Sequence, residues 1–198
     1  MTPKLFQIFR AGTFTSMQGA PLTFSESDLQ GMTAAFDSQR RPAPLVLGHP
    51  ENDQPAYGQV TGLFVKLGVL YAQAMVEDAL LALVQAKRYA RVSASFIAPF
   101  SEGNPARGAY YLKHVGFLGA LPPAVRGLEP PSFAERGNVL SFSESKAIVM
   151  PNAAVPVRGI NYDAERLVWH NLASEYREVC PALSYSEAVT LAQDALTF

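Results

Sequence analysis

Cysteine, unbalanced charge and long apolar runs are all scarce in this chain of 198 residues. The single cysteine, Cys180, excludes an internal disulfide framework and any zinc site built from cysteines. The 16 basic and 17 acidic side chains nearly cancel, so we expect neither nucleic acid nor an anionic membrane as a partner. No apolar run reaches the ~18 residues of a membrane span, and the N-terminus lacks the apolar core of a signal peptide. Proteins or peptides are the expected partners.

Signals for a cofactor are also absent from the sequence. No pair of histidines has the spacing of zinc ligands, and no glycine-rich phosphate loop follows a predicted strand. We therefore expect no metal and no cofactor. A composition with 48% hydrophobic and 17% charged residues is that of an ordinary domain, and a chain of this length can bury one main core.

The residues before position 128 have the pattern of an α+β domain. Apolar runs bounded by Gly and Pro predict strands at 4–9, 45–48, 89–97 and 109–121, and a hairpin over 57–76 that divides at Gly68. Helices are expected at 23–37, with Ser25 as N-cap and Asp28 three positions on, and at 77–88. Because strands and helices do not alternate regularly, the pattern favours a mostly antiparallel β-barrel with flanking helices.

The amino-acid composition of the sequence changes after residue 128. Residues 129–160 are rich in Pro, Ser, Asn and Gly, which is typical of a linker or extended arm. Two helices are predicted at 163–179 and 184–196, the second opened by Ser184 or Ser186 with Glu187 nearby. We therefore expect a main domain over 1–128, an arm over 129–160 and a short helical region over 161–198.

Polar residues interrupt three of the predicted strands or strand ends: His49, the pair Ser93 and Ser95, and His114. Residues two apart in a strand share a face, so the two serines point the same way. A serine becomes a nucleophile only when a base takes its proton and a third group orients that base. The two histidines could supply both roles if a curved sheet brought them together. The pattern alone is equally consistent with a turn histidine and with hydrogen-bonded strand serines.

Three segments carry a resemblance to a known family: "LVLGHPENDQPAYGQVTGL", "KRYARVSASF" and "YYLKHVGFLGALPPAVRGL". In this order and spacing they resemble the Mu-type phage I protein, a capsid-maturation protease and scaffold precursor. More distantly, they are similar to the prohead proteases and the herpesvirus assemblins. The resemblance covers roughly residues 40–128. It implies a β-barrel serine protease fold in which a histidine activates a strand serine and a third residue orients the histidine.

The resemblance assigns roles to the polar residues. His49, followed by Gly58 and Val60, matches the segment of the base, and Ser93 in "VSASF" matches the nucleophile. His114 falls where the third member belongs, which is a second histidine in assemblins and an acid in many prohead proteases. The implied triad is Ser93, His49 and His114.

Other residues are candidates to line the site. Ser95 shares the face of Ser93 and would bond a neighbouring backbone group, although it remains a second candidate for the nucleophile. Assemblins carry an arginine pair after the second histidine, where this chain has "ALPP"; Arg126 follows and is a loose match for an oxyanion group. Backbone N–H groups near Gly116 or Gly119 are further oxyanion candidates. Asp53 could orient His49, but its polar loop favours a solvated side chain.

The function implied is that of a serine endopeptidase of phage head maturation. Its expected substrates or assembly partners are the major capsid protein, the scaffold protein and the chain itself. Homodimer formation also comes into consideration, and the expected location is the bacterial host cytoplasm within the procapsid. The alternative is a non-catalytic scaffolding or structural head protein that keeps the protease fold.

Overall fold

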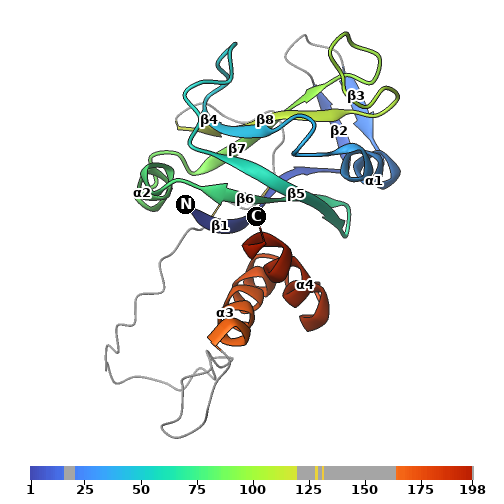
Figure 1. Cartoon of the computed structure of the whole chain (residues 1–198). Helices are drawn as coiled ribbons and strands as arrows, with labels where there is room; N and C mark the ends of the chain where they lie inside the picture. The colour runs from blue at the N-terminus through green and yellow to red at the C-terminus, as the bar shows by residue number, and fades with distance from the viewer. Residues whose placement is uncertain (16–20, 120–127, 129–130, 132–163, 198) are drawn as a thin grey trace, which may run out of the picture. The chain divides into compact units, whose positions relative to one another are not determined.

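The computed structural model describes residues 1–15, 21–119, 128, 131 and 164–197 (Figure 1). The chain divides into two compact units, one comprising Met1–Phe133 with Ala195–Phe198 and the other Ala134–Asp194. Apart from residue 131, the arm predicted over 129–160 lies outside the described residues. The three-part division made from the sequence therefore stays a prediction.

The first unit is built on a six-stranded sheet. Its neighbours run in the order β1-β6-β5-β4-β8-β7, and every adjacent pair is antiparallel except β4 and β8, which are parallel. The predicted α+β class with a mostly antiparallel sheet is confirmed. The strands are β1 (Thr2–Arg10), β4 (Ala43–Leu47), β5 (Gly58–Lys66), β6 (Val69–Val76), β7 (Arg91–Ile97) and β8 (Tyr111–Leu118).

The sheet curls into a half-barrel. Register shifts occur after Gln7 on β1, after Val60 on β5 and between β7 and β8, where Lys113 of β8 is the extra residue. An extra residue on one strand bends that strand and increases its twist. The two edge strands consequently approach each other, and the rings of Phe9 on β1 and Phe96 on β7 meet with centroids 5.1 Å apart. This curl is what brings residues distant in the sequence to one place.

Two helices of the first unit contribute apolar side chains to the same core as the sheet. The first, α1 (Glu26–Ala35), begins with the predicted capping box, in which Ser25 and Asp28 each bond the other's backbone N–H. The second, α2 (Asp78–Gln85), presents buried leucines at one face. The fully buried core includes Phe6, Ile8, Leu29, Met32, Leu45, Val60, Leu70, Leu80, Leu112, Val115 and Phe117.

One hairpin was predicted from the sequence, and one antiparallel pair of strands was missed. The predicted hairpin at Gly68 is present: Leu67 and Gly68, with φ of 51° and 71°, join β5 to β6. A second antiparallel pair, β2 (Gly12–Thr15) with β3 (Pro21–Phe24), was not expected from the sequence. Each of its strands has only four residues and neither has a buried apolar run, so the pattern gave no signal.

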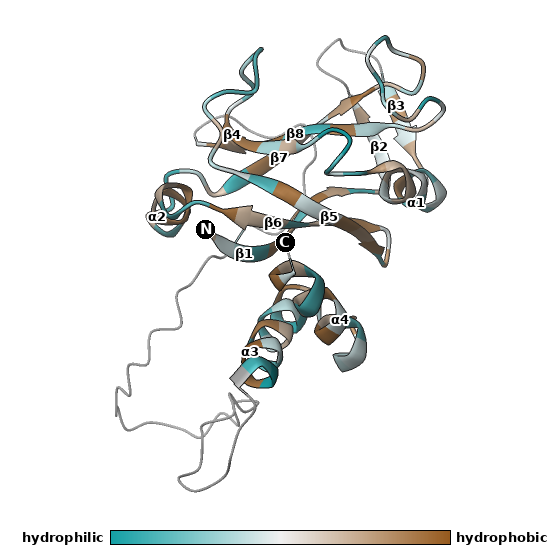
Figure 2. Ribbon diagram, viewed as in Figure 1, coloured by the Kyte–Doolittle hydropathy of each residue, from teal (hydrophilic) through white to brown (hydrophobic). Residues whose placement is uncertain are grey.

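The second unit contains α3 (Ala164–Val179), and α4 (Tyr185–Leu196) follows after a short turn. The side-chain oxygen of Ser184 accepts from Glu187 N, and the Glu187 carboxylate accepts from Ser184 N, which makes Ser184 the N-cap. Both helices carry hydrophobic and hydrophilic residues (Figure 2). No described helix has the length and apolar character needed to cross a membrane.

Candidate active site

Strand β8 is the element that gathers the candidate residues, because it lies between β4 and β7. In its register with β7, His114 faces Ser95 and Gly116 faces Ser93. Directly opposed residues on paired strands project from the same face of the sheet. Ser93, Ser95 and His114 therefore share one face, as the strand period predicted for the two serines.

His49 reaches that face from the end of β4. Gly48 donates its N–H to Phe117 O at 2.9 Å, and its φ of +70° then turns the chain over β8. A Cβ built on Gly116 would lie 2.1 Å from Gly48 O and 3.1 Å from His49 Cε1. The Gly48 carbonyl therefore occupies the space left by the missing side chain of Gly116, and the His49 ring adjoins it. Gly116 is the residue paired with Ser93 across β7 and β8.

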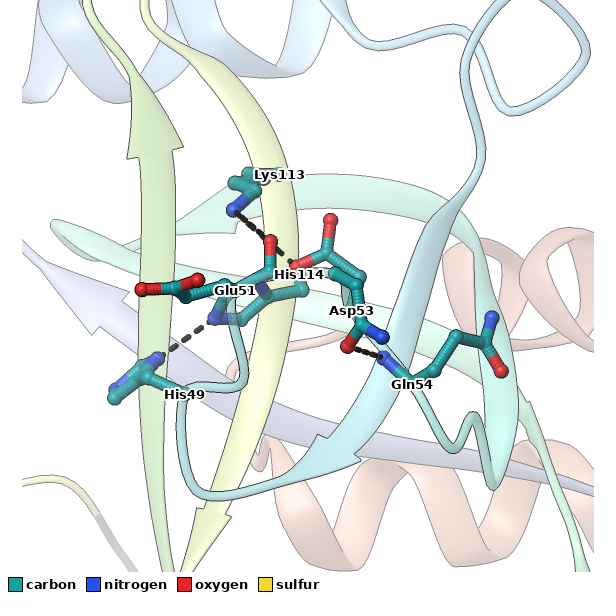
Figure 3. A network of polar contacts seen from close by, with 7 residues as sticks. His49, Glu51, Asp53, Gln54, Lys113 and His114 are labelled. Carbon is teal, nitrogen blue, oxygen red and sulfur yellow. Dashed lines mark hydrogen bonds and ion pairs between the residues drawn. The ribbon is translucent and has the colours of Figure 1, made fainter.

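A row of short polar contacts starts at His49 (Figure 3). Its Nδ1 lies 2.7 Å from Nε2 of His114, and the two rings are tilted by 39° with centroids 5.0 Å apart. The other ring nitrogen of His114, Nδ1, lies 2.6 Å from Oδ1 of Asp53. Lys113 extends the row, with Nζ 3.3 Å from the same oxygen of Asp53. Two imidazoles, a carboxylate and an ammonium thus form one network.

The loop after His49 is shaped so that Asp53 meets His114. Asp53 N donates to Pro50 O at 3.4 Å, and Gln54 N donates to the side chain of Asn52 at 3.3 Å. Asp53 itself has a φ of 57°, a left-handed conformation that Asp and Asn tolerate better than most residues. Figure 2 shows this loop as hydrophilic, yet one of its carboxylates turns inward.

Burial lowers the pKa of both histidines below the ordinary value of 6.5. For His49 the next causes, in the same direction, are the charges of His114 and Lys113. For His114, the hydrogen bond and charge of Asp53 oppose the effect of burial, and Lys113 adds to it. Both rings are consequently neutral at neutral pH, which is the state required of a general base before reaction.

Ser93 is half-buried, and His49 as a whole residue is exposed, so each retains access to solvent. Among the described residues, no hydrogen bond joins the Ser93 hydroxyl to His49. Catalytic hydrogen bonds are often long or poorly aligned before substrate binds, so this separation is compatible with a nucleophile and its base.

Comparison with known proteins gives a result at the level of structure. No protein-family model and no curated protein matches the sequence. Crystal structures of the Kaposi's sarcoma-associated herpesvirus protease do match. One in complex with an allosteric inhibitor has a TM-score of 0.51 at 13% identity and covers 100% of this chain and 92% of its own. Another, in complex with a dimer disruptor, has a TM-score of 0.51 at 14% identity, covering 100% and 91%. The fold is that of a herpesvirus protease.

The structure brings most of the predicted site residues together in this assemblin-like fold. His49 and His114 are in direct contact, Ser93 is paired with Gly116, and Ser95 lies opposite His114. Gly116 lines the site by making room for His49. The catalytic roles assigned to these residues from the sequence stay predictions.

The oxyanion roles of Gly119 and Arg126 stay predictions. A Cβ on Gly119 would meet Arg88 O at 3.1 Å and the ring of Tyr89, so this glycine faces the chain before β7 and not the histidines. Arg126 falls outside the described residues.

Both interpretations of Asp53 made from the sequence were wrong. Its side chain is only 20% exposed, so it is not simply solvated, and it contacts His114 rather than His49. The sequence signal was weak, because 61 residues separate Asp53 from its partner and no local spacing could pair them. Its place in the loop that follows His49 was the one available indication.

Proposed function

We propose that this chain is a serine endopeptidase with Ser93 as nucleophile, His49 as general base and His114 as the residue that orients His49. One observation carries the proposal: His49 Nδ1 is held 2.7 Å from His114 Nε2, and the His49 ring lies against Gly116, the residue paired with Ser93 across β7 and β8. That arrangement leaves Nε2 of His49 as the nitrogen available to the Ser93 hydroxyl. The fold of a known protease supports the same conclusion.

The proposed reaction is acyl transfer to Ser93. His49 Nε2 takes the hydroxyl proton as Ser93 Oγ attacks the scissile carbonyl, and His49 then returns the proton to the leaving amine. Water next attacks the acyl-enzyme, with His49 again accepting a proton, and Ser93 is regenerated. His114 holds the ring of His49 in place during both steps. A neutral imidazole supports the imidazolium less than a direct carboxylate would, so we expect modest turnover.

The sequence resemblance to the Mu-type phage I protein sets the proposed context. The substrates would be capsid protein, scaffold protein and the chain itself, cleaved in the bacterial host cytoplasm inside a procapsid. One structural relative was solved with a dimer disruptor, which supports a homodimer for this chain as well. Light scattering over a concentration series tests the dimer: a mass of one chain at every concentration would contradict it.

The direct test of the activity is the mass of the products. The full chain is incubated alone and with a candidate major capsid protein, and intact masses are followed over time. We expect defined fragments with wild type and with Ser95→Ala, and none with Ser93→Ala. Cleavage that continues in Ser93→Ala but stops in Ser95→Ala would move the nucleophile to Ser95.

A non-catalytic structural head protein is the competing function. The observation in its favour is that Ser93 and His49 are not hydrogen-bonded to each other in the structure. Concentrating the chain with its capsid protein in assembled procapsids decides between the two. Fragments that appear in this state alone support the protease, whereas intact masses in every assembly state support the structural role.

A further inference from the structure

The contact between Asp53 and His114 has a chemical consequence for His49, two residues along the row. We propose that Asp53 is a positioning residue that sets the tautomers of both imidazoles and so leaves Nε2 of His49 unprotonated. The inference deepens the proposed function and rests on it for its catalytic meaning. Its structural content, which ring nitrogen carries the proton, can be measured separately.

The first step follows from the carboxylate. An ionised carboxylate offers only acceptor oxygens, so the Asp53 Oδ1 contact at 2.6 Å requires a proton on Nδ1 of His114. A neutral imidazole carries one N–H and one bare nitrogen. With Nδ1 protonated, Nε2 of His114 must be the bare nitrogen and can only accept.

The second step carries this requirement to His49. Its Nδ1 lies 2.7 Å from the accepting Nε2 of His114, so Nδ1 of His49 must be the donor. The proton of neutral His49 is then on Nδ1, and its Nε2 is bare. A bare Nε2 is what a base needs in order to accept the proton of Ser93.

Without the carboxylate, the two rings can form the same hydrogen bond with donor and acceptor exchanged, which is called the opposite direction. His114 could carry its proton on Nε2 and donate to Nδ1 of His49, which would place the remaining proton of His49 on Nε2. In that direction the hydrogen bond between the rings is kept, but Nε2 of His49 carries a proton and cannot accept the proton of Ser93. The two histidines alone do not distinguish the two directions. Asp53 does.

The loop of Asp53 is suited to this role. The side chain of Asp53 is 20% exposed and that of His114 is 3% exposed, so the bond between them is partly shielded from water. Lys113 contacts Asp53 Oδ1 at 3.3 Å and the backbone oxygen of Glu51 at 3.5 Å, which ties the loop to β8 at two points.

The choice of variant follows from the backbone. Asp53→Ala would add strain, because alanine does not favour a φ of 57°. Asp53→Asn keeps the size and tolerates the conformation, and its amide can donate to His114 Nδ1 and so support the opposite direction. Glu51→Gln is the matched control: it makes the same change of charge in the same loop, at an exposed side chain.

Selective labelling makes the tautomers visible in the full chain. The sequence has 3 histidines, so ¹⁵N-histidine labelling gives three imidazoles, with His170 on α3 as the internal reference. Nitrogen chemical shifts separate protonated from bare ring nitrogens, and His49→Gln and His114→Gln assign the signals. For wild type at neutral pH we expect protonated Nδ1 and bare Nε2 on both His49 and His114. A wild-type His49 with protonated Nε2 would overturn the proposal, whatever the variants do.

In Asp53→Asn we expect His49 to shift toward the Nε2–H tautomer, with the signals of His170 unchanged. In Glu51→Gln all three rings should remain as in wild type. The rate of labelling by a fluorophosphonate should fall by about 10²-fold in Asp53→Asn and stay unchanged in Glu51→Gln. Tautomers that are the same in Asp53→Asn as in wild type would contradict the inference.

The two proposals can fail separately. If wild type neither labels nor cleaves but the tautomers still depend on Asp53, the protease proposal fails and the positioning role stands. If wild type cleaves through Ser93 but the tautomers do not respond to Asp53→Asn, the positioning role fails alone.

Discussion

Replacing Gly116 with alanine tests how His49 is held against β8. The added Cβ would lie 2.1 Å from Gly48 O, whereas ordinary contacts begin at 3.4 Å, so the backbone at Gly48 must move by about 1.3 Å, the difference of the two distances. The same Cβ would lie 3.1 Å from Cε1 of His49 and press directly on the base. Overpacking of this kind costs typically ~1–3 kcal/mol of stability, and a misplacement of about 1 Å at a reacting group costs ~10²-fold in rate.

Two assays separate these effects. Urea unfolding measures the loss of stability, and the rate of Ser93 labelling by a fluorophosphonate measures the position of the base. Gly62→Ala on β5 is the control, because its Cβ would meet only Gln73 Oε1 at 3.6 Å, an ordinary contact. A Gly116→Ala protein that is as stable as wild type and labels as fast would refute the placement of His49 over Gly116.

Three further predictions concern pH, a helix cap and a buried hydroxyl. The pKa values of His49 and His114 are lower in the folded chain than the ordinary value of 6.5, so on acidification the unfolded chain binds protons first. The contribution of the two histidines to the free energy of unfolding is therefore fully present above pH 6.5. It is lost as the pH falls from 6.5 through their pKa values in the folded chain. Urea midpoints measured across this window should fall more steeply in wild type than in His114→Gln; equal slopes would count against the lowered pKa of His114. Ser25→Ala removes the cap of α1 and should cost ~1 kcal/mol in urea unfolding, while Ser27→Ala, two residues further along, should cost little. Tyr111→Phe removes a hydroxyl that lies 2.6 Å from Asp37 O and 2.9 Å from Arg41 O, so we expect a loss of ~1–3 kcal/mol, against a small change in Tyr110→Phe.

Local sequence patterns predicted most elements of the first unit because each element carries its own signal. The capping residues Ser25 and Asp28 mark the start of α1, and Gly68 marks the turn of the long hairpin, so both were placed correctly. The parallel pairing of β4 with β8 had no such signal. Leu45 and Val115 are partners across 70 positions, and nothing local in either strand specifies the register.

The candidate site was predicted only in part for the same reason. Strand period placed Ser93 and Ser95 on one face, and family resemblance selected His49 and His114, but neither shows which group lies behind the second histidine. Asp53 reaches His114 because the loop turns at a left-handed residue and because β4 and β8 are neighbours. That contact depends on the tertiary fold, so no spacing in the sequence could have indicated it.

The measurement that tests the account most directly is the site of covalent modification by a fluorophosphonate, mapped by mass spectrometry of the digested full chain. Only an activated serine reacts with such a probe. The account predicts a single adduct on Ser93 in wild type and its loss in His49→Ala and in His114→Ala. An adduct on Ser95, or a Ser93 adduct that forms equally fast without His49, would contradict it.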